Sequence, residues 1–141
     1  MIKLGFVLIL FVVLSCSDIS SSEEENKVII EQTLTDISIA FNFDDLSGIM
    51  DRYHPDFLHN GNDWNDEEFI WEGRMIEYLE MEITDVEIDL ISSSRATAEF
   101  ILTFRNSETE VIWNEPSEEN GDLSYFSYVN SEWKISGNQI E

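Results

Sequence analysis

The chain has 141 residues and one cysteine, with 7 Lys and Arg against 30 Asp and Glu and a formal net charge of −23. This length suits a single domain whose core needs no disulfide, and a hydrophobic content of 43% argues against a disordered chain. So acidic a body repels phosphate groups, which argues against nucleic acid as a partner and against attachment to a membrane through basic residues.

The first segment combines a short apolar run with the single cysteine of the chain. After Lys3, the run from Leu4 to Leu14 is entirely apolar, too short for a membrane span of about 20 residues but typical of a signal-peptide core. Val13-Leu14-Ser15-Cys16 resembles the lipobox, in which the cysteine thiol is diacylated and the chain is cut just before it. We therefore expect residues 1–15 to be a signal peptide and Cys16 to carry the lipid that holds the protein at a membrane. An ordinary secretory signal with an incidental cysteine is the alternative.

The next segment, residues 16–26, is predicted to be the lipidated cysteine and an acidic flexible tether, because it is polar and lacks apolar periodicity. Ser17, in place of Asp after the cysteine, is typical of lipoproteins sent to the outer membrane. The run Ser22–Glu25 resembles the acidic signals that export lipoproteins to the cell surface in Bacteroidota, or it is a solvated spacer. The expected location is the cell envelope, at the outer membrane, on its periplasmic face or the cell surface.

Residues 27–141 are expected to form one domain that begins with helices. Apolar residues at helical spacing predict a first helix over 27–42; they are Ile30, Leu34, Ile37 and Phe41. Asp44 or Asp45 is expected to cap a short second helix, which ends before Pro55. A third helix is predicted to start at Asn65 or near Gly73. Its expected inward residues are Phe69, Ile76 and Leu79.

From Met81 onward the apolar residues alternate, which is typical of strands. A change of parity predicts a bulge near Thr84-Asp85, and the turn at Ser92–Ser94 leads into the most regular alternation of the chain. That second strand carries Ala96, Ala98, Phe100, Leu102 and Phe104. A short strand at Val111–Trp113 and a final hairpin about Asn130-Ser131 complete the pattern.

Helices followed by antiparallel strands predict an α+β fold, in which N-terminal helices pack on one face of a curved antiparallel sheet and enclose a conical hollow. This order, with the segments AFNFDDLSGIM, YHPDFLH, GRMIEYL and YFSYVNSEWKI, resembles the nuclear transport factor 2-like superfamily and its SnoaL-like branch over residues 28–140. The resemblance implies a cone-shaped, cystatin-like fold. Members of this superfamily include isomerases, dehydratases, cyclases, epoxide hydrolases and protein-binding modules, so the likeness selects no function. A homodimer is a further possibility that the resemblance implies, although the net charge opposes it.

Four residues near the end of the second helix are candidates for acid–base chemistry, namely Tyr53, His54, Asp56 and His59. A His-Asp pair can act as an oriented general base, and a tyrosine can donate a hydrogen bond to a developing oxyanion. The alternative is structural, with Tyr53 in the core, His54 at a helix end and Asp56 capping a turn.

Three residues of the third helix are candidates for ligand binding. Arg74 can hold an anionic ligand, or it can form an ion pair with Glu77, Asp66 or another nearby acid. Trp71 and Tyr78 can form aromatic walls of a pocket, or they can be ordinary core residues.

The sequence contains no motif for a metal or a cofactor. The spacing of His54, Asp56 and His59 matches no familiar metal-ligand motif, and there is no glycine-rich phosphate loop and no G-x-S-x-G sequence. We therefore expect neither a metal nor a cofactor, and whether the protein is an enzyme stays open.

Two functions remain. One is a non-catalytic module that binds a small molecule, most simply an apolar one, or an envelope protein. The other is a cofactor-independent lyase, isomerase or cyclase that acts on a small apolar substrate in the hollow. A deep pocket with a buried carboxylate or histidine of shifted pKa would favour the enzyme, and a hollow filled by Phe and Trp side chains would favour the module.

Overall fold

The computed structural model describes residues 17–117 and 120–139. Three helices are present in the described chain: α1 (Ser17–Asn42), α2 (Leu46–Met50) and α3 (Trp64–Glu77). A two-stranded ribbon, β1 (Leu58–His59) and β2 (Asn62–Asp63), precedes α3. The main sheet follows, with β3 (Glu80–Ser92), β4 (Arg95–Arg105), β5 (Glu110–Glu115), β6 (Tyr125–Val129) and β7 (Glu132–Ile135).

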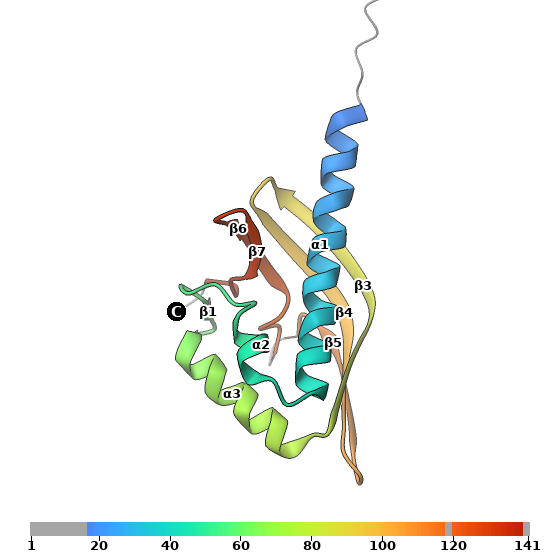
Figure 1. Ribbon diagram of the computed structural model, residues 1–141, viewed down its shortest axis with the longest axis vertical. Coiled ribbons are helices and arrows are strands. Elements are labelled where there is room, and N and C mark those ends of the chain that lie inside the picture. Colours follow the sequence, from blue (N-terminus) through green and yellow to red (C-terminus); the bar gives the residue numbers. More distant parts are fainter. Residues whose placement is uncertain (1–16, 118–119, 140–141) are drawn as a thin grey trace, which may run out of the picture.

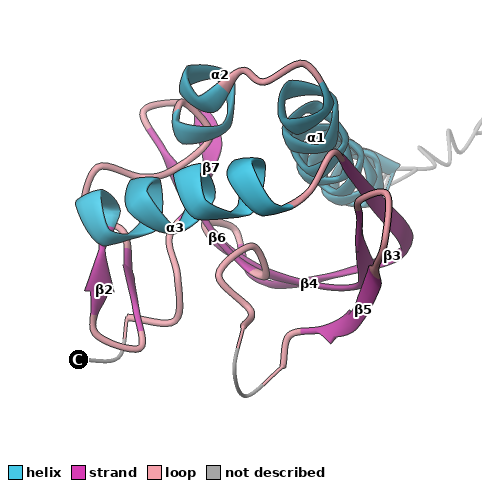
Figure 2. Cartoon of the chain, turned by 90° about the horizontal axis from the view of Figure 1, so that it is seen from below, coloured by secondary structure: helices cyan, strands magenta, loops and turns pink. Residues whose placement is uncertain are grey.

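The main sheet is antiparallel and is organised around β4. One edge of β4 pairs with β3, while its other edge pairs with β6 through Arg95–Thr97 and with β5 through Phe100–Arg105. The sheet is strongly curled, and the three helices lie on its concave side (Figures 1 and 2). The predicted α+β fold, with helices packed on a curved antiparallel sheet, is therefore confirmed.

Helix α1 begins at Ser17, ten residues before the predicted start at residue 27, so the segment expected to be a flexible tether is helical from that point. The predicted apolar stripe of α1 is fully buried. Its C-terminal half is held on β3 by hydrogen bonds, because Ser38 Oγ and Asn42 Nδ2 both donate to the carbonyl oxygen of Met81. Asn42 Oδ1 also accepts from the amide of Met81, at 2.8 Å.

Helix α3 begins at Trp64, after Asp63 as its N-cap, rather than at Asn65 or Gly73. The Asp63 side chain accepts from the amide of Asp66, whose own carboxylate accepts from the amide of Asp63, so the two form a capping box. The predicted inward face of α3 is wrong, because Phe69 (75%) and Ile76 (87%) are largely exposed, as is Leu79 (70%), which lies beyond the end of the helix. The helix instead turns Glu67, Trp71 and Arg74 inward. A prediction that assigns apolar residues to the buried face fails here because two of these three residues have ionisable side chains.

The strands follow the sequence pattern closely. The register of β3 against β4 shifts between Thr84 and Glu87, and Asp85 has a φ of 54°, which confirms the predicted bulge. All five alternating residues of β4 are at most 3% exposed. The final hairpin turns at Asn130 and Ser131, both with positive φ, as predicted.

Aromatic side chains fill much of the space between the helices and the sheet. The Phe104 ring of β4 contacts Phe41 of α1 at 5.3 Å, Tyr78 at 5.1 Å and Trp113 of β5 at 5.4 Å between ring centroids. Trp71 of α3 lies 6.4 Å from the same ring. This part of the hollow is therefore a packed core.

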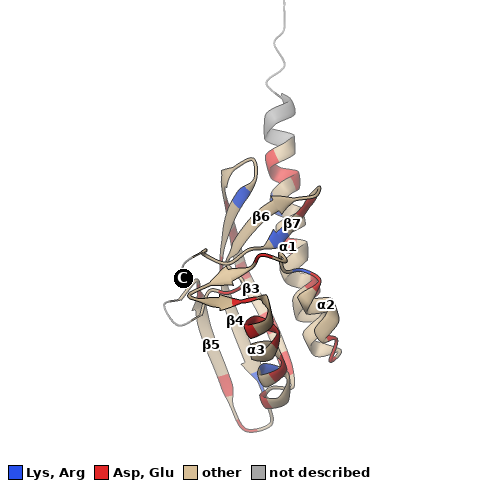
Figure 3. Cartoon of the chain, turned by 90° about the vertical axis from the view of Figure 1, so that its left-hand side faces the viewer, with Lys and Arg blue, Asp and Glu red and all other residues tan. Residues whose placement is uncertain are grey.

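The surface is acidic over both layers. Figure 3 shows Asp and Glu spread over the helices and the strands, with Lys and Arg at only a few places. Among the described residues, no helix has the length and the apolar content to span a membrane.

Candidate functional site

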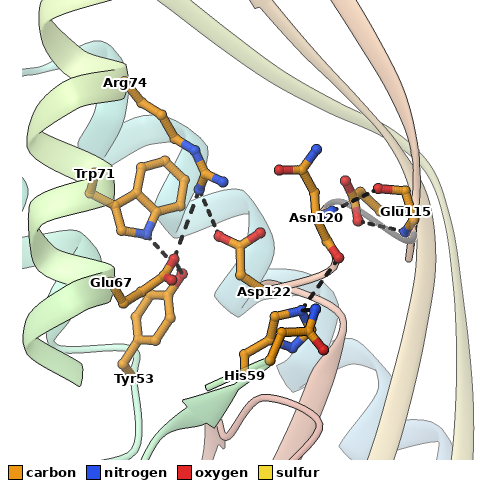
Figure 4. A network of polar contacts seen from close by, with 10 residues as sticks. Tyr53, His59, Glu67, Trp71, Arg74, Glu115, Asn120 and Asp122 are labelled. Atoms are coloured by element: carbon orange, nitrogen blue, oxygen red, sulfur yellow. Dashed lines mark hydrogen bonds and ion pairs between the residues drawn. The ribbon is translucent and has the colours of Figure 1, made fainter. Parts of the chain in front are cut away.

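A cluster of buried polar side chains lies where α3 faces the segment between β5 and β6. Glu67, Trp71 and Arg74 follow one another at spacings of four and three residues, so they share the inward face of α3 (Figure 4). Asp122 approaches from the segment between β5 and β6, and Tyr53 comes from the segment after α2. Glu67, Tyr53 and Asp122 are 1%, 3% and 5% exposed.

The members of this polar cluster are joined by direct contacts. Arg74 Nη1 lies 2.6 Å from Asp122 Oδ2 and 3.8 Å from Glu67 Oε1. The Tyr53 hydroxyl donates to Glu67 Oε1 at 3.1 Å and accepts from Trp71 Nε1 at 2.8 Å. The guanidinium of Arg74 also lies over the Trp71 ring, 4.6 Å from its centroid, as a cation–π contact. One cation thus serves two carboxyl groups.

Burial and charge give the two carboxyl groups opposite protonation states. Burial, and then the negative charge of Asp122, raises the pKa of Glu67 to about 10. Burial also opposes ionisation of Asp122, but the attraction of Arg74 outweighs it and holds the pKa of Asp122 well below its usual range. At neutral pH, Glu67 is therefore protonated and Asp122 is ionised. Together with Arg74 the cluster is electrically neutral.

Part of the cluster opens into a cavity of about 130 Å³. The cavity is lined by His59, Asn60, Asn62, Glu67, Ile70, Arg74, Asn120 and Asp122. Seven of its eight lining residues are polar or charged, and its volume is well below the roughly 300 Å³ at which pockets for drug-sized ligands begin. It has room for a ligand of a few heavy atoms.

His59 lies in the wall of this polar cavity in a defined orientation. Its ring is 5% exposed, and Nδ1 accepts from the amide of Asn138 at 3.3 Å. Nε2 lies 3.3 Å from the carbonyl oxygen of Asn120 and 3.2 Å from Nδ2 of Asn60. His59 is therefore held in place by contacts at both ring nitrogens.

The other sequence candidates near His59 lie elsewhere. His54 Nδ1 accepts from the amide of Asp56 at 2.9 Å, so the contact between these two residues is a local turn and not a carboxylate on an imidazole. Asp56 is exposed. Among the residues that the structure describes, no group of His, Cys, Asp or Glu side chains is placed to hold a metal ion.

The candidates on α3 divide between the cluster and the core. Trp71 is fully buried, and its indole N–H donates to Tyr53. Arg74 forms the ion pair expected as the alternative to ligand binding, with Asp122 and Glu67 as its partners in place of Glu77 or Asp66. Tyr78 stacks on Phe104 and does not line the cavity. The predicted lipidation site, Cys16, lies outside the described residues.

Two central residues, Glu67 and Asp122, were not candidates in the sequence. Glu67 had a usable signal, because it lies four residues before Trp71 and seven before Arg74 and so shares their helix face. Asp122 had no such signal in the sequence, because only the path of the chain from β5 to β6 brings it close to α3.

A third carboxyl group lies near the cluster, at the end of β5. Glu115 is 4% exposed, and its Oε2 accepts from the amide of Ser117 at 3.1 Å. Its Oε1 has no hydrogen-bond partner among the described residues. Burial, and then the charge of Asp122, raises the pKa of Glu115 to about 7. This carboxyl group therefore titrates near neutral pH.

The sequence has no significant match to a protein-family model or to a curated protein. Its structure is similar to solved structures of low sequence identity. A nuclear transport factor 2-like protein of unknown function from Shewanella oneidensis is 17% identical, with a TM-score of 0.60 over 81% of this chain and 95% of that one. A protein of unknown function with a cystatin-like fold from Nostoc punctiforme is 12% identical, with a TM-score of 0.61 over 80% and 87%.

A third similar structure is a protein from Novosphingobium aromaticivorans provisionally assigned as a scytalone dehydratase. It is 12% identical, with a TM-score of 0.60 over 84% of each chain. Likenesses at such identities concern the fold and leave the activity open. The chain has the nuclear transport factor 2-like, cystatin-like α+β fold.

Proposed function

We propose that this protein is a lipoprotein of the bacterial cell envelope, held at the outer membrane by a lipid on Cys16. The apolar run and the lipobox-like sequence before this cysteine support the proposal. The acidic chain would be repelled by anionic headgroups, which favours attachment through a lipid over attachment through basic residues.

The anchor is tested by mass spectrometry of the protein isolated from a bacterial membrane. The wild-type chain should begin at Cys16 and carry the mass of its acyl chains, whereas Cys16→Ser should lack them and leave the membrane fraction. Ser17→Asp is the matched control, since it should keep the lipid and change only the membrane in which the protein is found. A wild-type protein that carries no lipid would refute the proposal.

For the folded domain, we propose a non-catalytic binding module whose ligand is small, neutral and polar. The observation that carries this proposal is the polar cavity, into which a neutral carboxyl group and a buried ion pair converge. Arg74, a protonated Glu67 and the amide side chains of the wall supply hydrogen-bond donors, and Asp122 supplies acceptors. Such a lining suits a polar ligand better than the apolar one expected for the hollow.

The charge of the ligand follows from the same contacts. Arg74 is already neutralised by Asp122 at 2.6 Å, so an anion would have to compete with a buried carboxylate and with a body of charge −23. A cationic ligand would be repelled by the guanidinium of Arg74. A neutral molecule of a few heavy atoms, with both donor and acceptor groups, meets neither penalty.

A second candidate function is a cofactor-independent lyase, isomerase or cyclase. It is favoured by one observation: Glu67, whose raised pKa favours the protonated form, lines the same cavity as His59. A carboxylic acid can donate a proton to a leaving group, and a neutral imidazole can accept one. The fold is compatible with this chemistry, as the similarity to the provisionally assigned dehydratase illustrates.

Glu67→Gln distinguishes the two functions. Glutamine keeps the size and the neutral hydrogen-bonding groups of a protonated glutamate but cannot transfer a proton.

A library of neutral polar molecules should be screened by native mass spectrometry and thermal shift, with Glu72→Gln, an exposed change on the same helix, as the control. For a binding module, Glu67→Gln should retain the ligand and Arg74→Met should lose it. For an enzyme, Glu67→Gln should bind its compound but stop its conversion. If no compound binds the wild-type protein, the small-ligand proposal fails.

A further inference from the structure

A second and larger cavity, of about 420 Å³, lies between the N-terminal half of α1 and the β6–β7 hairpin. We call it the hairpin groove. It is lined by Glu25, Asn26, Ile29, Thr33, Arg52, Tyr128, Ser131, Glu132, Trp133 and Lys134. It shares no lining residue with the polar cavity of the candidate site. Its volume falls in the range of roughly 300–1,000 Å³ that is typical of ligand sites.

One wall of the hairpin groove is a supported aromatic surface. Trp133 is 4% exposed, and its Nε1 donates to Asn26 Oδ1 at 3.0 Å, so the indole is fixed against α1. The Tyr128 ring lies 5.3 Å from it between centroids and is 44% exposed. Ile29 of α1, 43% exposed, adds an aliphatic contact. A ligand in the groove would contact the exposed Tyr128 ring, which packs against the buried Trp133 ring.

Two charged residues of the hairpin groove, Arg52 and Lys134, form ion pairs. Arg52 Nη2 lies 3.0 Å from Asp36 Oδ2, and Lys134 Nζ lies 3.0 Å from Glu132 Oε2. Glu25 adds a further carboxylate to the lining. The lining thus carries two cationic and two anionic side chains, so the groove offers donors and acceptors without an excess of positive charge that would attract an anion.

We propose that the hairpin groove binds a neutral saccharide. A pyranose ring presents a face of C–H groups that packs on an aromatic ring, and its hydroxyl groups both donate and accept hydrogen bonds. These two properties match the Tyr128 wall and the paired charges around it. A purely apolar ligand would leave the charged groups desolvated, and an anionic one would face Glu25 and Glu132.

The proposal is tested by titrating neutral disaccharides, namely cellobiose, maltose, lactose and N,N′-diacetylchitobiose, into the full-length protein in detergent micelles. The indole N–H resonance of Trp133, identified with Trp133→Phe, reports on the groove by nuclear magnetic resonance. At least one of these sugars should shift it in a saturable way. Tyr128→Ala should weaken that binding at least tenfold, because it removes the stacking surface. Phe69→Ala, an exposed aromatic change on α3, should leave it unchanged.

Three outcomes would overturn the proposal: no response to any of the four sugars, equal affinity in Tyr128→Ala, or tighter binding of digalacturonate than of its neutral counterparts. Thermal unfolding of each variant shows whether Tyr128→Ala remains folded, as expected for a residue that is nearly half exposed. Retention of sugar binding in Glu67→Gln and Arg74→Met would show that the hairpin groove acts independently of the polar cavity.

Discussion

Arg74 is the residue on which the buried polar cluster depends. It supplies the cation that keeps Asp122 ionised in the interior, and it also lies within 4 Å of Glu67. A buried charge without a partner is costly, whereas a buried pair is close to neutral in its effect on stability. The surrounding aromatic groups hold the guanidinium in place, since it lies over the Trp71 ring.

Replacing Arg74 with methionine should lower the free energy of unfolding by about 3–5 kcal/mol, because Asp122 would be left buried without a cation. Urea denaturation followed by circular dichroism measures the loss. Arg105→Met is the control, since Arg105 forms ion pairs with Glu82 and Glu110 at the surface and its loss should change little. The double variant Arg74→Met/Asp122→Asn should recover part of the stability. Equal effects of the two arginine variants would contradict the assigned role.

The carboxyl groups of the site predict how stability depends on pH. The pKa of Glu67 rises from 4.5 to about 10 on folding, and that of Glu115 rises from 4.5 to about 7. The folded state therefore binds more protons than the unfolded state above pH 4.5, so stability falls as the pH rises. Asp122 acts in the opposite sense: its lowered pKa makes stability fall as the pH drops below its ordinary value of 3.8. Maximum stability is expected at about pH 4–5.

Urea denaturation at about pH 5, 7 and 9 measures this slope. Glu67→Gln should flatten it, because glutamine cannot titrate, and the exposed variant Glu72→Gln should retain it. A stability that rises from pH 5 to pH 9 would show that Glu67 is ionised in the folded protein.

At the scale of elements, α3 illustrates how a helix can place polar groups inside and apolar groups outside. Its capping box at Asp63 and Asp66 fixes where it begins, and packing against other elements decides which face turns inward. The inward face then carries Glu67 and Arg74. The helix also contains Gly73, a weak helix former, at a position with open space around it.

Two glycine substitutions should act in opposite directions. Gly73→Ala should raise the free energy of unfolding by about 0.5–1 kcal/mol, because no atom lies within 4 Å of the added methyl group and alanine favours the helix. Gly137→Ala should lower it by about 1–3 kcal/mol, since Gly137 has a φ of +70° and its Cβ would collide with the carbonyl oxygen of Leu58. Thermal and urea unfolding of both variants check the pair. A destabilised Gly73→Ala would mean that this face of α3 is covered.

At the scale of the whole molecule, the acidic composition acts against the compact state. Asp and Glu occur on both layers, so like charges are brought together on folding (Figure 3). The apolar core formed by α1, β4 and the aromatic cluster must outweigh this repulsion.

Salt should therefore stabilise the protein. Raising sodium chloride from about 0.01 M to about 0.5 M shortens the screening length severalfold and should increase the urea midpoint. A triple variant with Glu68, Glu72 and Glu77 changed to glutamine should show a smaller increase, because it carries less repulsion to screen. A midpoint that falls with salt would indicate that the surface ion pairs, such as the one between Arg105 and Glu82, outweigh the repulsion.

The sequence by itself determined the parts of the fold that depend on local periodicity. The stripe of α1, the alternation of β4, the bulge at Asp85 and the turn at Asn130-Ser131 all follow from spacing or turn chemistry, and the structure confirms each of them. These features need only the residues that form them, because a helix or strand with one apolar face has one way to bury it.

Only the tertiary structure decided the site. It turned Glu67 inward, brought Asp122 to Arg74 across 48 residues of chain, and separated His59 from His54 and Asp56. A buried charge is stable only beside its partner, and that partner comes from another element whose position no local pattern specifies. The inward face of α3 was therefore hidden from a prediction that assigns apolar residues to the core.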